Sequence, residues 1–188
     1  MEKTLKQQPS NCIKIVLFGP ESTGKTTLSK QLAVHFNTLW VPEYMRQYLQ
    51  SKWDAEGKKC TVDDLTPIAE GQMQLENDLA KRANSLLICD TNLLEISVYS
   101  KHYYNGFCPE EIEKYAKESF YDLYFLTATD VPWEMDDLRD RPNDRQKMFC
   151  TFESQLKEYK LQYEILKGSQ SERFEFAVEK ILELFKEI

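Results

Sequence analysis

The chain has 188 residues, 41% apolar and 12% aromatic, enough for one domain with a well-filled core. Its 31 acidic and 24 basic residues leave a net charge of -7, which argues against nucleic-acid binding through a broadly basic surface. No apolar run approaches the ~18 residues of a membrane helix, and the polar N-terminus lacks the apolar stretch of a secretory signal. Five scattered cysteines and two distant histidines support neither disulfides nor zinc. We therefore expect a reduced, cytoplasmic protein.

Strand-like and helix-like segments alternate along the chain. Short apolar runs predict strands at residues 13–18, 39–41, 86–89, 123–126 and 163–166. Helical spacing of apolar residues predicts helices at 28–36, 66–82, 92–102, 109–119, 144–160 and 171–186, and Thr66-Pro67 is expected to open the second one. Strands separated by such helices pair in parallel with helices on both faces. The sequence predicts a three-layer α/β domain with a five-stranded parallel sheet over residues 13–188, after a disordered or loosely ordered tail at residues 1–12.

A phosphate-binding motif follows the first predicted strand. Gly19-Pro-Glu-Ser-Thr-Gly-Lys-Thr26 matches G-x-x-x-x-G-K-[ST] at every fixed position, and an amphipathic helix follows it. In such a loop, backbone N–H groups surround the β-phosphate, the lysine serves the β- and γ-phosphates, and the threonine hydroxyl ligates Mg²⁺. The motif predicts a P-loop NTPase fold with ATP and Mg²⁺ as cofactors. The residues assigned to ATP in this loop are Gly19, Glu21, Ser22, Thr23, Gly24, Lys25, Thr26 and Thr27.

The motifs that follow the later strands indicate which class of P-loop protein this is. A GTPase would carry Asp-x-x-Gly after the third strand, where this chain has Asp90-Thr-Asn-Leu93, and a later Asn-Lys-x-Asp that the sequence lacks. Small-molecule kinases instead have an acid after strand two, an acid after strand three and an arginine-rich lid. These three features are all found here, so the sequence favours a small-molecule kinase.

Two acids follow strands whose carboxyl ends face the P-loop crevice, where ligands of doubly wound sheets bind. Glu43 follows the second strand and is assigned to the acceptor hydroxyl, whereas Asp90 follows the third and is assigned, with Thr26, to the metal. Either carboxylate could still be the general base. Arg46 would share a helical face with Glu43 if a helix begins there, and could clamp the acceptor or pair with Glu43.

An arginine-rich segment follows the fourth strand and predicts a lid at about residues 130–147. Clustered arginines are costly unless an anion lies between them, and in phosphoryl transfer such a segment closes over ATP. Arg139 and Arg141 are the expected catalytic arginines, and Arg139 and Arg145 the expected ATP contacts. The alternative is a solvated loop in which neighbouring aspartates pair the arginines.

Together these motifs resemble the ribosylnicotinamide kinase domain of the NadR family of NAD-biosynthesis proteins. The markers are the P-loop, Glu43-Tyr-Met-Arg46, Cys89-Asp90-Thr91, and Pro132-Trp133 leading through Asp136-Asp137-Leu138-Arg139 into the lid. The resemblance implies ATP-dependent phosphorylation of the 5′-hydroxyl of nicotinamide riboside, giving nicotinamide mononucleotide. It also implies that Glu43 and Asp90 match the family's acids, and Arg139, Arg141 and Arg145 its lid. We expect a stand-alone domain without the adenylyltransferase or DNA-binding parts.

The nicotinamide ring of nicotinamide riboside carries a positive charge. Aromatic faces attract such a cation, and the negative potential of acidic side chains suits it. Trp40, Tyr44, Tyr48 and Trp133 are aromatic candidates near the crevice, with Trp133 favoured, and Asp136-Asp137 adds negative potential. The expected substrate contacts are Glu43, Tyr44, Arg46, Trp133 and Asp137. Another nucleoside or nucleoside-monophosphate kinase, or a nucleotide-switch ATPase without a small acceptor, remains an alternative. The sequence does not predict the oligomeric state.

Overall fold

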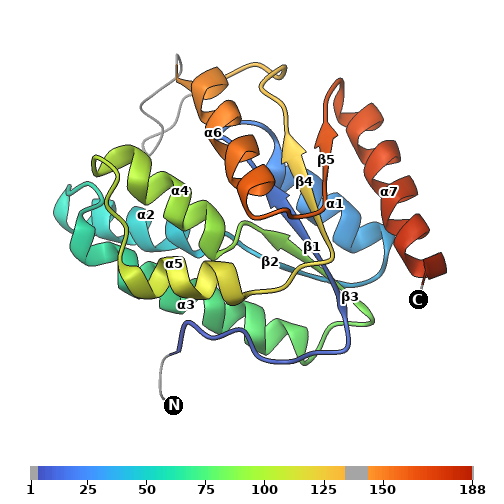
Figure 1. The fold of residues 1–188 in the computed structure, drawn as a ribbon, viewed down its shortest axis with the longest axis horizontal. Helices are drawn as coiled ribbons and strands as arrows, with labels where there is room; N and C mark the ends of the chain where they lie inside the picture. Colours follow the sequence, from blue (N-terminus) through green and yellow to red (C-terminus); the bar gives the residue numbers. More distant parts are fainter. Residues whose placement is uncertain (1–3, 134–143, 188) are drawn as a thin grey trace.

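Five apolar runs form the strands of one sheet. The computed structural model of the chain describes residues 4–133 and 144–187. Its strands are β1 (Ile13–Phe18), β2 (Leu39–Val41), β3 (Leu86–Asp90), β4 (Leu123–Thr127) and β5 (Tyr163–Leu166). All neighbouring strands pair in parallel, in the order β2-β3-β1-β4-β5 (Figure 1). The predicted five-stranded parallel sheet is confirmed, and the carboxyl ends of its strands share one edge.

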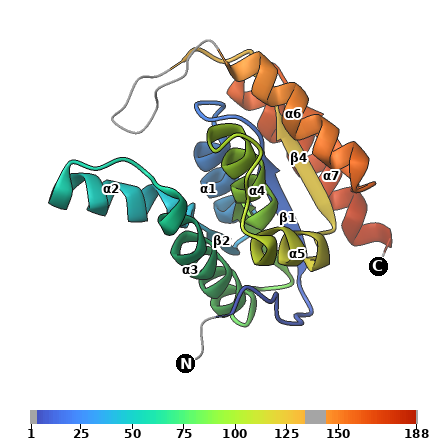
Figure 2. The same ribbon diagram turned by 60° about the vertical axis from the view of Figure 1, so that its left-hand side comes forward.

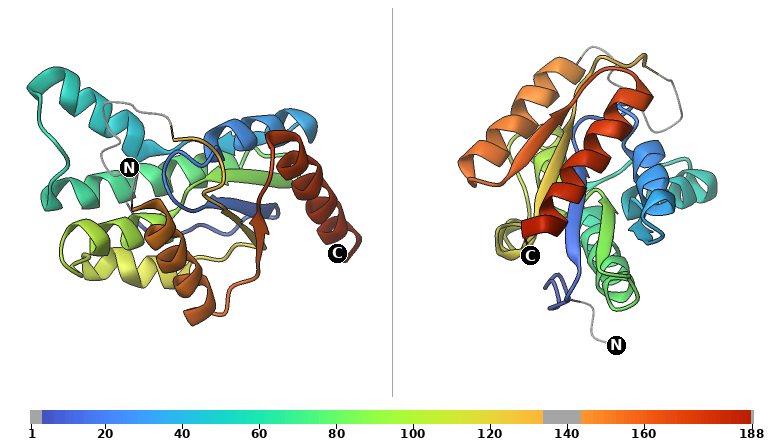
Figure 3. Two further views of the ribbon diagram at one scale, coloured as in Figure 1. Left: turned by 90° about the horizontal axis from the view of Figure 1, so that it is seen from above. Right: turned by 90° about the vertical axis from the view of Figure 1, so that its right-hand side faces the viewer.

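Helices cover both faces of this sheet. They are α1 (Lys25–His35), α2 (Tyr44–Glu56), α3 (Val62–Ala80), α4 (Leu93–Tyr103), α5 (Glu110–Glu118), α6 (Arg145–Glu158) and α7 (Gln170–Glu187). Helices α1 and α7 pack on one face and α3 to α6 on the other, with the sheet between the two layers (Figure 3). Helix α2 extends from the sheet beside α3 and buries none of its residues (Figure 2). Within the described residues, no helix is long and apolar enough to cross a membrane.

The central strand β1 is apolar at every position except Lys14. All six of its residues are buried, and successive side chains point to opposite layers. Ile15 and Leu17 pack in the cluster that includes Leu32 of α1, whereas Val16 and Phe18 pack in the cluster that includes Phe152 of α6. The ammonium of Lys14 is compensated by Glu76 of α3 at 2.9 Å. Because both faces of β1 are covered, its short apolar run was a dependable signal.

Helix α3 begins at Val62, earlier than Thr66-Pro67, so the predicted start is wrong. The N-cap is Thr61, whose backbone N–H and hydroxyl donate to Asp64 Oδ2 at 2.7 and 2.8 Å. This capping interaction satisfies donors at the helix start, whereas Pro67 lies inside the helix and forgoes one backbone hydrogen bond. The preference of proline for the first turn pointed to the wrong residue.

Asp64 links three parts of the molecule. Besides Thr61, it accepts hydrogen bonds from the Lys52 ammonium of α2 and, at 3.1 Å, from the Tyr48 hydroxyl. Burial alone would raise the pKa of Asp64, but the hydrogen bonds from Lys52 and Thr61 outweigh it and lower the pKa to about 2. Because the folded pKa lies below the ordinary value of about 3.9, this carboxylate stabilises the fold above that pH.

We expect Asp64→Asn to lower the free energy of unfolding at pH 7 by about 1 kcal/mol, as for a lost helix cap. The stabilisation from Asp64 is lost as the pH falls from about 4 towards 2, so the variant and the natural protein should converge in stability there. Urea unfolding at pH 7 and pH 3 measures both effects. Asp63→Asn, which changes an exposed acid in the same helical turn, is the matched control. If the free energies of unfolding of Asp64→Asn and the natural protein differ by the same amount at both pH values, this role of Asp64 is contradicted.

The described residues that precede β1 contact the rest of the domain. Leu5 is buried, and Gln7 exchanges hydrogen bonds with the backbone of Phe120 at 2.8 and 3.0 Å. Gln7 also donates to Glu76 of α3 at 2.8 Å. Gln7 therefore joins this segment to α3 and to the chain that leads into β4.

Candidate active site

The loop between β1 and α1 has the backbone conformation that its glycines allow. Gly19 has φ +134°, and a Cβ there would lie 2.7 Å from Thr127 Oγ1 of β4. Gly24 has φ +84° and is the N-cap residue of α1. The Thr23 hydroxyl lies 2.7 Å from the Thr127 hydroxyl and 2.7 Å from the Pro20 carbonyl oxygen. The loop is therefore held against the end of β4, with the start of α1 behind it.

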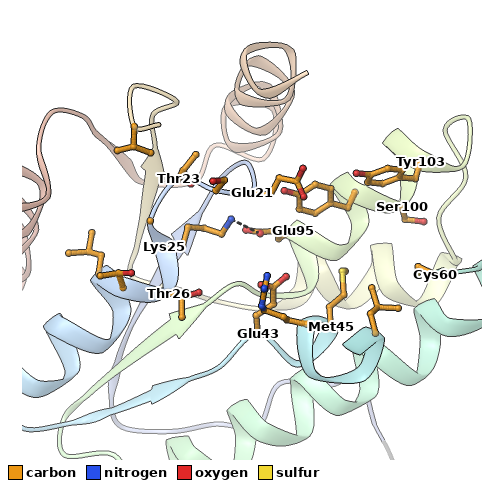
Figure 4. A pocket seen from close by; sticks show the side chains of 18 of the residues that line it. Glu21, Thr23, Lys25, Thr26, Glu43, Met45, Cys60, Glu95, Ser100 and Tyr103 are labelled. Carbon is orange, nitrogen blue, oxygen red and sulfur yellow. Dashed lines mark ion pairs between the residues drawn. The ribbon is translucent and has the colours of Figure 1, made fainter. Parts of the chain in front are cut away.

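Lys25 folds into this loop and is largely buried. Its ammonium donates hydrogen bonds to the carbonyl oxygens of Gly19 at 2.6 Å and Pro20 at 3.0 Å, and it lies 3.2 Å from Glu95 Oε1 of α4 (Figure 4). Burial would lower the pKa of Lys25, but the charges of Glu95, Glu43 and Asp90 outweigh it and raise the pKa. The lysine is thus a fixed cation at neutral pH.

The two sequence-predicted acids occupy different positions. Glu43 is the N-cap residue of α2 and lines the cavity in front of the loop. Asp90 is fully buried at the end of β3, and neither of its carboxylate oxygens has a hydrogen-bond partner within the described residues. Burial and the charge of Glu43 raise the pKa of Asp90 to about 6, against the opposing effects of Thr26 and Lys25. Glu43 can therefore touch a ligand directly, whereas Asp90 acts from beneath the cavity surface.

The Thr26 hydroxyl and the Asp90 carboxylate fit the needs of Mg²⁺. A buried carboxylate without a partner is the kind of group that a cation or its bound water satisfies. Mg²⁺ in phosphate-transfer sites uses few protein ligands and completes its shell with water and phosphate oxygens. The described residues form no group of three or more His, Cys, Asp or Glu side chains able to hold a metal.

A cavity of about 690 Å³ extends from the loop between α2 and α4. Its volume lies within the range of small-molecule sites. Figure 4 shows Lys25, Glu43 and Glu95 converging at the end next to the loop. Apolar and aromatic side chains from α2, α4 and the segments that follow them also line the cavity: Met45, Leu49, Trp53, Cys60, Tyr99, Tyr103 and Tyr104.

Most of the sequence-predicted contacts meet at this cavity. Glu43, Arg46 and the loop residues line it, with the exception of Gly19, which supports the loop from behind; the lining loop residues are Glu21, Ser22, Thr23, Gly24, Lys25, Thr26 and Thr27. The predicted contacts Arg139, Arg141 and Asp137 lie outside the described residues.

Tyr44 is not among the residues that line the cavity. As the first residue of α2, it donates its backbone N–H to Gln72 Oε1 of α3 at 2.8 Å. Its ring packs so closely on Gly71 that a Cβ there would overlap it. Tyr44 therefore joins α2 to α3, and its contact with a substrate stays a prediction.

Trp133 and Arg145 contact each other at the base of the expected lid. The Arg145 guanidinium lies 5.8 Å from the centre of the Trp133 ring. It donates to the Val131 carbonyl oxygen at 2.9 and 3.0 Å and to the Ser22 carbonyl oxygen at 3.1 Å. Neither residue is among the described residues that line the cavity. Arg145 thus contacts the backbone of the loop at Ser22, and its contact with ATP stays a prediction.

Sequence reasoning missed two buried residues that contact the loop. Glu95 pairs with Lys25, and its only local signal was that of an ordinary acid in the first turn of a helix. Arg173 of α7 is 4% exposed and donates to the carbonyl oxygens of Thr23 at 2.8 Å and Ala128 at 3.0 Å, besides pairing with Asp130. It joins the P-loop to the end of β4 from 150 residues away in sequence, a contact that no local pattern indicates.

A family model described as an AAA domain matches residues 14–173, which is most of the chain. The chain belongs to this AAA-domain family (AAA_28). Among curated proteins, this chain is 29% identical over 176 residues to the trifunctional NAD biosynthesis/regulator protein NadR of Salmonella typhimurium. It is 28% identical over 176 residues to the NadR of Escherichia coli. The resemblance to NadR is thereby confirmed. The alignments cover 92% of this chain but 43% of each NadR, so the chain spans less than half the length of these relatives.

Solved structures share the fold of this AAA-domain chain. A crystal structure of NadR in complex with NR superposes with a TM-score of 0.74 at 21% identity, covering 92% of this chain and 51% of that one. Deoxyadenosine kinase from M. mycoides with bound products gives a TM-score of 0.63 at 16% identity, covering 91% of this chain and 100% of that one. These likenesses confirm the expected P-loop kinase fold.

Proposed function

We propose that this chain is an ATP-dependent kinase that phosphorylates the 5′-hydroxyl of nicotinamide riboside, giving nicotinamide mononucleotide and ADP. The observation that carries the proposal is that the P-loop lysine and a carboxylate after β2 line one cavity, with apolar and aromatic walls beyond them. Similarity to NadR across 92% of the chain supports the choice of acceptor. The proposed kinase domain comprises residues 13–188, including the arginine-rich lid.

On the donor side, the P-loop would hold the phosphates of ATP. Its backbone N–H groups and Lys25 would neutralise the β- and γ-phosphates, and Thr26 and Asp90 would hold Mg²⁺. When bound, Mg²⁺ neutralises charge on the phosphate oxygens. Arg139 and Arg141 would approach the γ-phosphate from the lid.

On the acceptor side, Glu43 would take the proton of the 5′-hydroxyl while the 5′-oxygen attacks the γ-phosphorus in line. The new bond joins that oxygen to phosphorus, and the bond from phosphorus to the bridging oxygen of ADP breaks. Glu43 suits this role because it lines the cavity, whereas Asp90 is fully buried. Arg46 would clamp the transferred group or orient Glu43.

The chemistry of the cavity suits a cationic aromatic acceptor. Trp53, Tyr99 and Tyr103 line the cavity, and aromatic faces attract a positively charged pyridine ring. Glu43 and Glu95 line the same cavity and add negative potential. These aromatic residues replace Tyr44 and Trp133 as the proposed ring contacts.

A panel of acceptors tests this proposal. We expect ADP release above the acceptor-free rate with nicotinamide riboside and little or none with uridine, deoxyadenosine or thymidine monophosphate. Each acceptor is measured at equal concentration with ATP and Mg²⁺, and a Lys25→Ala protein provides the background rate. Equal stimulation by all nucleosides would contradict nicotinamide riboside as the specific acceptor.

A second candidate is a nucleoside or nucleoside-monophosphate kinase. Besides Lys25 and Arg173, the cavity is lined by the cations Arg46, Lys58 and Lys59, which could bind the phosphate of a monophosphate acceptor. Stimulation by a monophosphate alone would favour this candidate. ATP hydrolysis that no acceptor accelerates would favour a nucleotide-switch ATPase instead.

A further inference from the structure

Glu95 joins the two ends of the P-loop motif. Its Oε1 lies 3.2 Å from Lys25 Nζ, and its Oε2 accepts a hydrogen bond from the backbone N–H of Gly19 at 3.3 Å. The side chain is 2% exposed, and it reaches the loop from α4 across the cavity end shown in Figure 4. The carboxylate therefore contacts the cation that a P-loop offers to the phosphates of a nucleotide.

The start of α4 fixes this carboxylate in place. Asn92 is the N-cap residue, and its side-chain oxygen accepts a hydrogen bond from the Glu95 backbone N–H at 3.1 Å. Asn92 itself donates to the Tyr124 hydroxyl at 3.0 Å in the core. The cap therefore fixes the backbone of Glu95, and its side chain contacts the loop from the first turn of α4.

A negative charge at this position is costly. Burial, together with the charges of Glu43 and Asp90, raises the pKa of Glu95 to about 8 against the opposing charge and hydrogen bond of Lys25. Lys25 is the group that compensates the Glu95 carboxylate at short range. Removing Lys25 from this pair leaves a buried carboxylate facing other acids.

We propose that Glu95 is a positioning residue that pairs with Lys25 when no phosphate is bound. To contact Lys25, the phosphates of ATP must then compete with the Glu95 carboxylate. One ammonium cannot neutralise a buried carboxylate and an incoming polyphosphate equally, and the carboxylate repels the phosphates directly. Glu95 thus keeps the lysine ordered in the loop and weakens nucleotide binding. The inference rests on the nucleotide site of the proposed function and is independent of the acceptor.

Calorimetric titration of the full chain with the non-hydrolysable ATP analogue AMP-PNP and Mg²⁺ tests the inference. At pH 9, where Glu95 is ionised and Lys25 is still charged, we expect Glu95→Gln, which removes the charge and keeps the shape, to bind the analogue about tenfold more tightly than the natural protein. A purely structural role would lower the thermal stability of the variant without tightening binding. If Glu95→Gln does not fold, Glu95→Met removes both charge and polarity at similar length, with the same expected direction.

Glu76→Gln is the matched control. Glu76 is a fully buried glutamate of α3 that lies 2.9 Å from the Lys14 ammonium, at the opposite ends of the strands from the P-loop. This variant should lose stability without a change in affinity for the analogue. Equal or weaker binding by the Glu95 variant would overturn the role of Glu95 and leave the acceptor panel unaffected. If neither protein binds the analogue, both this inference and the proposed kinase function fail.

Discussion

Replacing Lys25 by alanine should lower kcat/KM for ATP on the order of a thousandfold, the scale of losing a main electrostatic stabiliser of a transition state. Lys25 lies within the loop, bound to the Gly19 and Pro20 carbonyl oxygens. It is the cation that would meet the charge developing on the transferred phosphoryl group. Steady-state kinetics with nicotinamide riboside and ATP measure the effect.

Lys30→Ala is the matched control for this prediction. Lys30 lies on the exposed side of the same helix, 5.2 Å from the centre of the Trp40 ring. Its loss should change kcat/KM less than about threefold, as expected for an exposed charge. A Lys25→Ala protein that retains a tenth or more of the natural rate would show that phosphoryl transfer takes place elsewhere.

Glu43→Gln should lower kcat by about a hundredfold or more and leave the affinity for AMP-PNP nearly unchanged. The reason is that a general base contributes to the chemical step and not to nucleotide binding. Glu43 lines the cavity beside Lys25, so its carboxylate is accessible to an acceptor hydroxyl. Rapid-quench measurement of a single turnover separates this step from product release.

Asp90→Asn is the informative comparison for Glu43→Gln. Because Asp90 is buried beneath Thr26, we expect its variant to raise the Mg²⁺ concentration needed for half-maximal rate by about tenfold. Suppose instead that, at saturating Mg²⁺, kcat of Asp90→Asn is about a hundredfold below that of the natural protein, whereas kcat of Glu43→Gln is nearly unchanged. The roles of general base and metal ligand must then be exchanged between Glu43 and Asp90.

The sheet and the P-loop were predictable because their signals are local. The buried strand β3 is a continuous apolar run up to its last residue, Asp90, and the loop needs glycine where a Cβ would collide, as at Gly19. The P-loop also fixes which end of the sheet carries the site. For the same reason, the amino-acid sequence was sufficient to place the acids that follow β2 and β3 near Lys25.

The features that were missed depend on contacts between distant segments. Helix α2 was not among the predicted helices, although Met45, Leu49 and Trp53 recur at helical spacing. These side chains line the cavity, and no residue of the helix is fully buried in the core. Tyr44 follows directly after Glu43, yet its ring packs on Gly71 of α3, because adjacent residues at a helix start point in different directions. The loop contacts of Glu95 and Arg173 arise only once α4 and α7 are packed against the P-loop.

The central claim is that one cavity passes the γ-phosphoryl group of ATP to the 5′-oxygen of nicotinamide riboside. Phosphorus NMR of a reaction containing enzyme, ATP, Mg²⁺ and nicotinamide riboside follows that group directly. We predict a phosphomonoester signal of nicotinamide mononucleotide that grows in equal amount with ADP. Formation of ADP with inorganic phosphate alone, at the same rate with and without nicotinamide riboside, would contradict the claim.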